Sequence, residues 1–161
     1  MARLLVVHHS PTPVVRGLTD AVLAGARDDA VTGVEVVERE ALAATAADVL
    51  SADGYLLGTT ANFGYMSGAL KHFFDTIFLE AGGALTEDGS ASGGSGGKRP
   101  FGLWVHGRYD TTGAVRSVES IVGALPWRQS APVLEVLGEV GDREREAAYE
   151  LGGTIAALLS E

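Results

Sequence analysis

Short runs rich in apolar residues alternate with amphipathic segments along the whole chain. Such runs predict five buried strands, at residues 4–7, 34–37, 54–58, 101–105 and 133–137. The segments between them repeat apolar residues every three or four positions, the spacing of one helical face. The clearest repeat is Leu70, Phe73, Phe74, Ile77 and Phe78. Alternating strands and helices predict one α/β domain over residues 1–161, with helices on both faces of a doubly wound parallel sheet.

The other helices are predicted from the same spacing. A first helix turns inward Val14, Val15, Leu18, Ala21, Val22 and Gly25, and an Ala-rich helix spans Ala41–Leu50. A later helix buries Val115, Val118, Val122 and Leu125, and a last one, capped by Asp142, buries Ala147, Ala148, Leu151, Ile155 and Leu158. A doubly wound sheet has a switch point in its strand order, and open α/β sheets bind ligands there.

One segment interrupts the alternation. Residues 82–97 hold seven glycines and three serines in sixteen positions. This composition is typical of flexible segments, so we expect a surface loop over residues 82–99.

Composition narrows the function classes. The net charge of −9 argues against a nucleic-acid partner, because phosphate neutralisation requires clustered Lys and Arg. The chain has no cysteine, which excludes disulfides and thiol redox chemistry. The apolar run 4–7 is too short for a signal peptide or a membrane span, so we expect a cytoplasmic protein without membrane insertion. His8 and His9 are adjacent on a strand and point to opposite faces, so we expect no metal site.

The loop after the third predicted strand carries an unusual set of side chains. Asn62, Phe63 and Tyr65 lie among glycines between the strand 54–58 and Ser67, a good N-cap for the helix that follows. Aromatic and amide side chains in a flexible loop suit a flat aromatic ligand with polar edges, held by backbone N–H groups.

The loop after the first strand has the features of a phosphate site. Thr12 as N-cap with Pro13 at the first helical position is a strong helix start. The hydroxyls of Ser10 and Thr12, with the N–H groups of Thr12, Val14 and Val15, form a cradle at the positive end of a helix.

Residues 58–71, with the pattern Gly-Thr-x-x-x-Phe-Gly-x-Met-Ser-Gly-x-Leu-Lys, closely resemble the flavin loop of the flavodoxin-like NAD(P)H:quinone oxidoreductases and the related NADPH-dependent FMN reductases. The resemblance implies a flavodoxin-like fold, in which the five strands follow the order 2-1-3-4-5 with the switch point between strands 1 and 3. It also implies FMN as cofactor. It places the FMN phosphate at Ser10, Thr12, Val14 and Val15, and the ring at Thr59, Thr60, Ala61, Asn62, Phe63 and Gly64. A third loop, His106, Gly107, Arg108 and Tyr109, flanks the other edge of the ring.

The same resemblance implies an activity. NAD(P)H reduces the flavin, which passes electrons to a quinone or another small-molecule acceptor, and the protein forms a homodimer or homotetramer. His106 is the candidate catalytic residue, because an imidazole at a strand end can hydrogen-bond a substrate carbonyl or supply a proton. Two departures stand out: Pro13 replaces a frequent glycine, and the segment at 82–97 is shorter than the family's insertion.

Two alternatives remain open. One is a flavodoxin-type electron carrier, which the net acidity suits because carriers dock basic partners. The other is a flavodoxin-fold binding domain without flavin. A flavin absorbance spectrum of the purified protein separates the flavin-free binding domain from both the oxidoreductase and the electron carrier.

Overall fold

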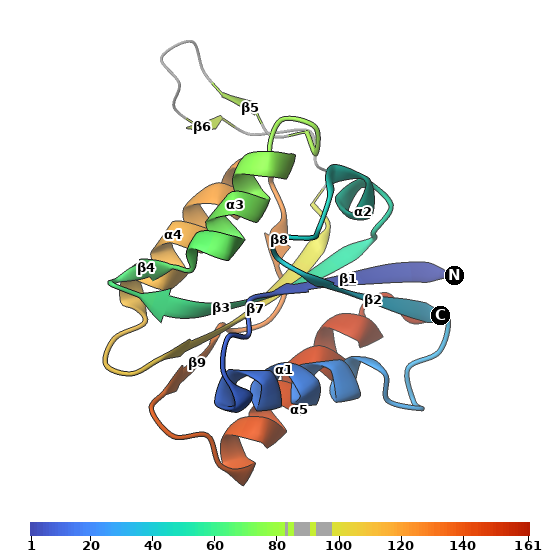
Figure 1. Ribbon diagram of the computed structural model, residues 1–161. Helices are drawn as coiled ribbons and strands as arrows, with labels where there is room; N and C mark the ends of the chain where they lie inside the picture. The colour runs from blue at the N-terminus through green and yellow to red at the C-terminus, as the bar shows by residue number, and fades with distance from the viewer. Residues whose placement is uncertain (83, 86–90, 93–97) are drawn as a thin grey trace.

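The computed structural model describes residues 1–82, 84–85, 91–92 and 98–161. One mainly parallel sheet lies between two layers of helices (Figure 1). On one face lie α2 (Ala46–Leu50), α3 (Gly68–Ile77) and α4 (Thr112–Ala124); on the other lie α1 (Pro13–Ala26) and α5 (Asp142–Ala157).

The sheet has the predicted arrangement around its centre. Its order is β2-β1-β3-β7, formed by β2 (Val34–Glu40), β1 (Ala2–His8), β3 (Gly54–Asn62) and β7 (Pro100–Gly107), all parallel. The switch point therefore lies between β1 and β3, as expected.

The fifth position of the sheet differs from the prediction. Two short strands share the outer edge of β7: β8 (Arg128–Gln129) pairs with its start, and β9 (Leu134–Leu137) with its end. Pro132 lies between them, and a proline has no N–H to donate to a sheet. The predicted strand at 133–137 is thus confirmed, but it forms only half of the edge.

Side chains of the central strands alternate between two cores. Leu5 and Val7 pack toward α2, α3 and α4, whereas Leu4 and Val6 pack toward α1 and α5. Each strand is buried on both faces, which explains its uninterrupted apolar sequence. The predicted helical face of α3 is confirmed, since Leu70, Phe73, Phe74 and Ile77 are buried.

Several predicted boundaries are wrong. The predicted helix at Ala41–Leu50 is only α2, because Thr45 and Asp48 form a capping box that starts the helix at Ala46. The N-cap of α5 is Gly141, not Asp142. The predicted inward residues Val14 and Leu158 are instead about half exposed, because they lie at helix ends beyond the cover of the sheet.

Most of the predicted loop at residues 82–99 lies outside the described residues. Within it, β5 (Ala84–Leu85) and β6 (Ala91–Ser92) pair as a small antiparallel sheet. A further short strand, β4 (Tyr65–Met66), pairs antiparallel with the end of β3.

Candidate functional site

A pocket opens at the carboxyl ends of β1, β3, β7 and β9. Its volume is about 640 Å³. Its lining residues come from four loops that the parallel sheet brings to one edge: Pro11, Thr12, Val14, Val15, Thr60, Ala61, Asn62, His106, Gly107, Arg108, Gly138 and Glu139. The two loops that the sequence singled out, after the first and third strands, therefore face one cavity.

The start of α1 presents polar backbone groups to this pocket. The Thr12 hydroxyl caps the helix by accepting a hydrogen bond from the Val15 N–H at 3.3 Å. Among the described residues, no hydrogen bond uses the N–H groups of Thr12 or Val14, and Pro13 has none to offer. Two free donors at the positive end of a helix suit an anion.

Neighbouring threonines of β3 have opposite roles. Thr59 is 1% exposed, and its hydroxyl donates to the Thr60 carbonyl at 2.9 Å and accepts from the Ser67 N–H at 2.9 Å. Thr60 is 9% exposed and lines the pocket, and its hydroxyl is the one buried side-chain polar atom of the described residues without a partner. Native proteins rarely leave such a group unpaired, and in the pocket the Thr60 hydroxyl is available to a hydrogen-bonding ligand.

A tight turn joins β3 to β4 at the rim. Asn62 pairs with Tyr65, and the two residues between them, Phe63 and Gly64, have φ of 51° and 75°. Two positive φ angles in a two-residue hairpin are typical of a type I′ turn. The turn lies against α4: a Cβ on Gly113 would be only 1.8 Å from the Gly64 carbonyl oxygen. This contact holds the backbone of the turn, which carries Phe63, against α4.

The ends of β7 and β9 are braced together. His106 Nε2 lies 2.7 Å from the Gly138 carbonyl oxygen, and the Gly138 N–H donates to the Gly107 carbonyl at 2.8 Å. Because a carbonyl only accepts, Nε2 carries the proton and Nδ1 of the neutral ring is an acceptor. His106 lies within β7, one residue before its end, rather than beyond it.

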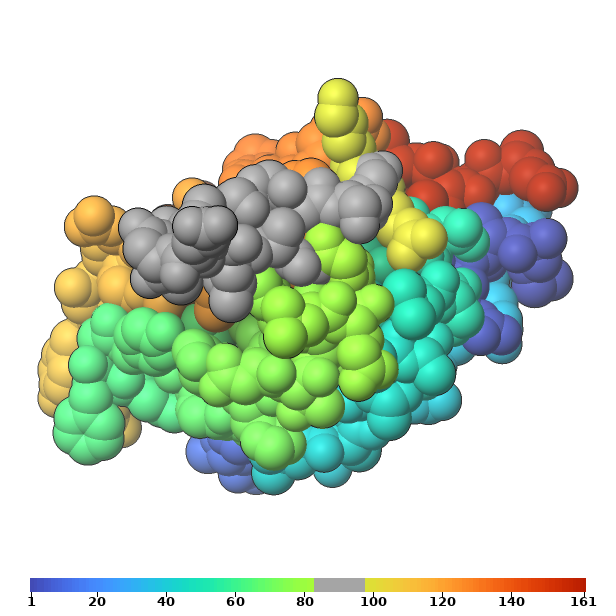
Figure 2. Space-filling model, turned by 90° about the horizontal axis from the view of Figure 1, so that it is seen from above, coloured from blue at the N-terminus to red at the C-terminus, as the bar shows by residue number. Residues whose placement is uncertain are grey.

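Two aromatic side chains stand free beside the pocket. Phe63 and Tyr109 are 110% and 85% exposed, and each directly follows a lining residue, Asn62 or Arg108. The β3–β4 turn and the loop between β7 and α4 project from the same end of the molecule in both views (Figures 1 and 2). Exposed aromatic rings on two adjacent rims provide apolar surface for a flat ligand.

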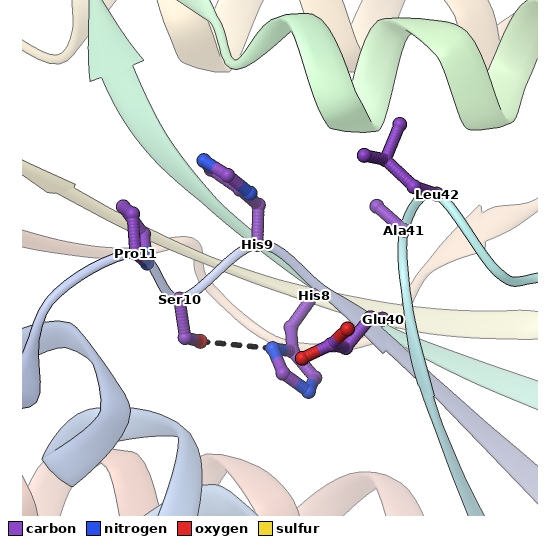
Figure 3. A pocket seen from close by; sticks show the side chains of 7 residues that line it. All are labelled: His8, His9, Ser10, Pro11, Glu40, Ala41 and Leu42. Atoms are coloured by element: carbon purple, nitrogen blue, oxygen red, sulfur yellow. Dashed lines mark hydrogen bonds between the residues drawn. The ribbon is translucent and has the colours of Figure 1, made fainter.

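A smaller pocket, of about 240 Å³, lies on the other side of the first loop. It is lined by His8, His9, Ser10, Pro11, Glu40, Ala41 and Leu42 (Figure 3). The Ser10 hydroxyl is directed away from the larger pocket, and its oxygen lies 2.8 Å from His8 Nδ1 and 2.7 Å from the Thr19 hydroxyl.

Most predicted site residues line the larger pocket. The exceptions are Ser10, Thr59, Phe63, Gly64 and Tyr109, which lie in the same loops but do not line it. Sequence reasoning missed Pro11 and the turn Gly138–Glu139. The signal was available for the turn, because glycine directly after a predicted parallel strand places another loop at the binding edge.

The part of the chain that the structure describes contains no group of three His, Cys, Asp or Glu residues able to hold a metal ion. None of its helices has both the length and the apolar character needed to cross a membrane.

Comparison with known proteins gave the following relatives. No family model matches the chain. A protein named flavodoxin from Aquifex aeolicus (strain VF5) is 35% identical over 103 residues, which are 60% of this chain and 54% of that protein. The match thus spans about half the length of this curated relative.

Solved structures match over nearly the whole chain. A flavodoxin from the domain Archaea has a TM-score of 0.77 at 14% identity, with 98% of each chain covered. The flavodoxin of Streptococcus pneumoniae TIGR4 has 0.74 at 19%, over 98% of this chain and 99% of that one. A WrbA-like protein from Agrobacterium tumefaciens has 0.70 at 16%, over 99% and 98%. Together with the strand order around the switch point, these matches show that the chain has the flavodoxin-like α/β fold.

Proposed function

We propose that this protein binds FMN in the larger pocket and transfers electrons in the manner of a flavodoxin. The observation that carries the proposal is the unpartnered Thr60 hydroxyl, buried in a pocket that the start of α1 also borders. The similarity to flavodoxins in fold, and to one over 103 residues of sequence, supports FMN as the ligand.

The residues present suit both ends of FMN. The N–H groups of Thr12 and Val14 would hold the phosphate, which needs donors and favours a helix N-terminus. Thr60 and Asn62 would hydrogen-bond the polar edge of the ring, and Phe63 and Tyr109 would cover its apolar surface. Bound FMN supplies the redox chemistry, while these residues bind it, orient it and exclude water from it.

A second candidate function is an NAD(P)H:quinone oxidoreductase. It is favoured by the motif at residues 58–71 and by the exposed Arg108 and half-buried His106 at the pocket rim. The Arg108 side chain has no hydrogen-bond or ion-pair partner among the described residues, and its positive charge would attract an anionic electron donor such as NAD(P)H. His106 would accept a hydrogen bond at Nδ1, since its Nε2 donates to the Gly138 carbonyl. Homodimer or homotetramer formation stays a prediction.

Substituting the two threonines tests the proposed site. Thr60→Val removes an unpaired hydroxyl at constant shape, so we expect the ligand-free protein to gain up to about 1 kcal/mol of stability. FMN affinity should fall roughly fivefold to tenfold, the value of one neutral hydrogen bond. Thr59→Val is the matched control: it removes the hydroxyl that accepts from the buried Ser67 N–H and donates to the Thr60 carbonyl, so the protein should lose about 1–3 kcal/mol of stability.

Urea unfolding and FMN fluorescence titration measure these effects. Unchanged FMN affinity in Thr60→Val would mean that the hydroxyl does not contact the ligand. A protein that binds no FMN at all contradicts the proposed function.

Turnover separates the two candidate functions. An electron carrier loaded with FMN does not oxidise NADH or NADPH by itself, whereas an oxidoreductase consumes one of them when benzoquinone is added. If turnover occurs, anaerobic stopped flow of His106→Ala tests the catalytic role. Slower reoxidation by the quinone, with unchanged reduction by NAD(P)H, supports that role.

A further inference from the structure

The smaller pocket lies directly beside the proposed phosphate site. Strands β2 and β3 pair with opposite edges of β1, and the smaller pocket opens where β1 and β2 end. Neighbouring strands lie about 4.8 Å apart, so the two pockets are separated only by the first loop. Pro11, in that loop, lines both of them. A ligand held at the start of α1 therefore has room to extend over the loop into the smaller pocket.

Hydrogen-bonding groups that the fold does not use line the smaller pocket. Glu40 is the last residue of β2 and is exposed there. Its carboxylate has no hydrogen bond or ion pair among the described residues. Within the same part of the chain, no hydrogen bond uses the N–H groups of Ser10 or Leu42. A carboxylate accepts and an N–H donates, so the pocket suits a ligand that carries both donors and acceptors.

The rest of the pocket wall is an aliphatic side chain and a ring. Leu42 is 68% exposed. Figure 3 shows its side chain and the His9 ring on one side of the pocket and Glu40 on the other. An imidazole and an aliphatic side chain suit the face of an aromatic base, whereas a carboxylate suits the hydroxyls of a sugar. A base joined to a ribose meets both requirements.

The place of Glu40 in the fold points to the same ligand. In dinucleotide-binding α/β folds, the pyrophosphate lies at the start of the first helix, and an Asp or Glu about 20 residues further on accepts a hydrogen bond from the adenosine ribose. Here α1 begins at Pro13, and Glu40 ends the strand that follows this helix. That strand, β2, lies next to β1, as the second strand does in those folds.

We propose that the smaller pocket binds the adenosine half of FAD, whose FMN half occupies the larger pocket. FAD is FMN joined through its phosphate to AMP, so its second phosphate directly follows the one held at the start of α1. The ribose hydroxyls would donate to the Glu40 carboxylate, and adenine would lie against His9 and Leu42. The inference rests on the proposed FMN function and extends the ligand of that site from a mononucleotide to a dinucleotide.

Titration calorimetry with FMN, FAD and the 2′-deoxyadenosine analogue of FAD tests the inference. We expect the wild-type protein to bind FAD at least roughly tenfold more tightly than FMN. It should also prefer FAD to the analogue roughly tenfold, the effect of one hydrogen bond to a charged group. In Glu40→Ala this second preference should fall to about one. Repulsion between Glu40 and the phosphates is the same for FAD and the analogue, so it cancels in their ratio.

Glu119→Ala is the matched control, because it removes an exposed carboxylate of α4 that lines neither pocket. It should keep both preferences. FAD binding that is no tighter than FMN binding, or a wild-type protein that does not distinguish FAD from the analogue, overturns the inference and leaves FMN binding intact. An unchanged preference in Glu40→Ala overturns it too, because the ribose would then lie elsewhere. A protein that binds neither flavin overturns the proposed function and this inference with it.

Discussion

The contact between α4 and the β3–β4 turn predicts a substitution that damages the site more than the fold. Gly113 is the second residue of α4, and a Cβ there would lie 1.8 Å from the Gly64 carbonyl oxygen. Carbon and oxygen atoms approach to about 3.3 Å, so in Gly113→Ala the turn must retreat by about 1.5 Å. The turn carries Phe63, which we expect to cover the ring of FMN.

Two effects oppose each other in the stability of Gly113→Ala. Crowding of this size costs about 1–3 kcal/mol, and alanine in a helix regains about 1 kcal/mol over glycine. We therefore expect a net loss of up to about 2 kcal/mol. FMN affinity should fall roughly tenfold, because an aromatic contact is worth about 0.5–1.5 kcal/mol beyond its buried area.

Gly123→Ala is the matched control on the same helix. A Cβ at Gly123 has no atom within 4 Å, so the substitution should add about 0.5–1 kcal/mol and leave FMN binding unchanged. Urea unfolding gives the free energies, and quenching of FMN fluorescence gives the affinities. Equal stability and equal FMN affinity of the two variants would refute the reasoning.

Three further outcomes are expected. Gly58→Ala places a Cβ 2.1 Å from the buried ring of Trp104, so urea unfolding should show a loss of about 2–3 kcal/mol. Burial lowers the pKa of His8 from 6.5, so below pH 6.5 the unfolded chain binds more protons than the folded protein. The free energy of unfolding should therefore fall as the pH drops below 6.5, and His8→Gln should lessen the fall. Arg108→Gln should leave stability within about 0.5 kcal/mol and weaken FMN binding several-fold at low salt, with less effect at high salt.

The central strands were predictable from the sequence, because burial on both faces requires uninterrupted apolar runs. Their order was predictable only from the resemblance to flavodoxin-like proteins. Helix starts were less predictable. The inner face assigned to α1 included Val14, yet the first turn of that helix extends past the sheet and borders the pocket. The late start of α2 had a visible signal, the Thr45 and Asp48 capping box, which competed with an alanine-rich run.

For the site, sequence reasoning identified the loops better than the individual side chains. It named both Thr59 and Thr60, but only the hydrogen bond from Ser67 to the Thr59 hydroxyl shows that one hydroxyl is structural and the other unpaired. It named Ser10, but the binding of its hydroxyl to His8 depends on a histidine, a glutamate and an arginine brought together from three elements. Such three-dimensional pairings leave no periodic trace in a sequence.

The central claim is that the start of α1 holds the phosphate of FMN, and one pair of variants tests it most directly. Aspartate and asparagine both cap helices well, so Thr12→Asp and Thr12→Asn should preserve α1 and differ only in charge. We predict that Thr12→Asp lowers FMN affinity at least 100-fold relative to Thr12→Asn, by repulsion of the phosphate at a distance of a few ångströms, on the order of 3 kcal/mol. Riboflavin affinity should be nearly the same in both variants. Equal FMN affinities in the two variants would contradict the account, because the phosphate would then lie elsewhere.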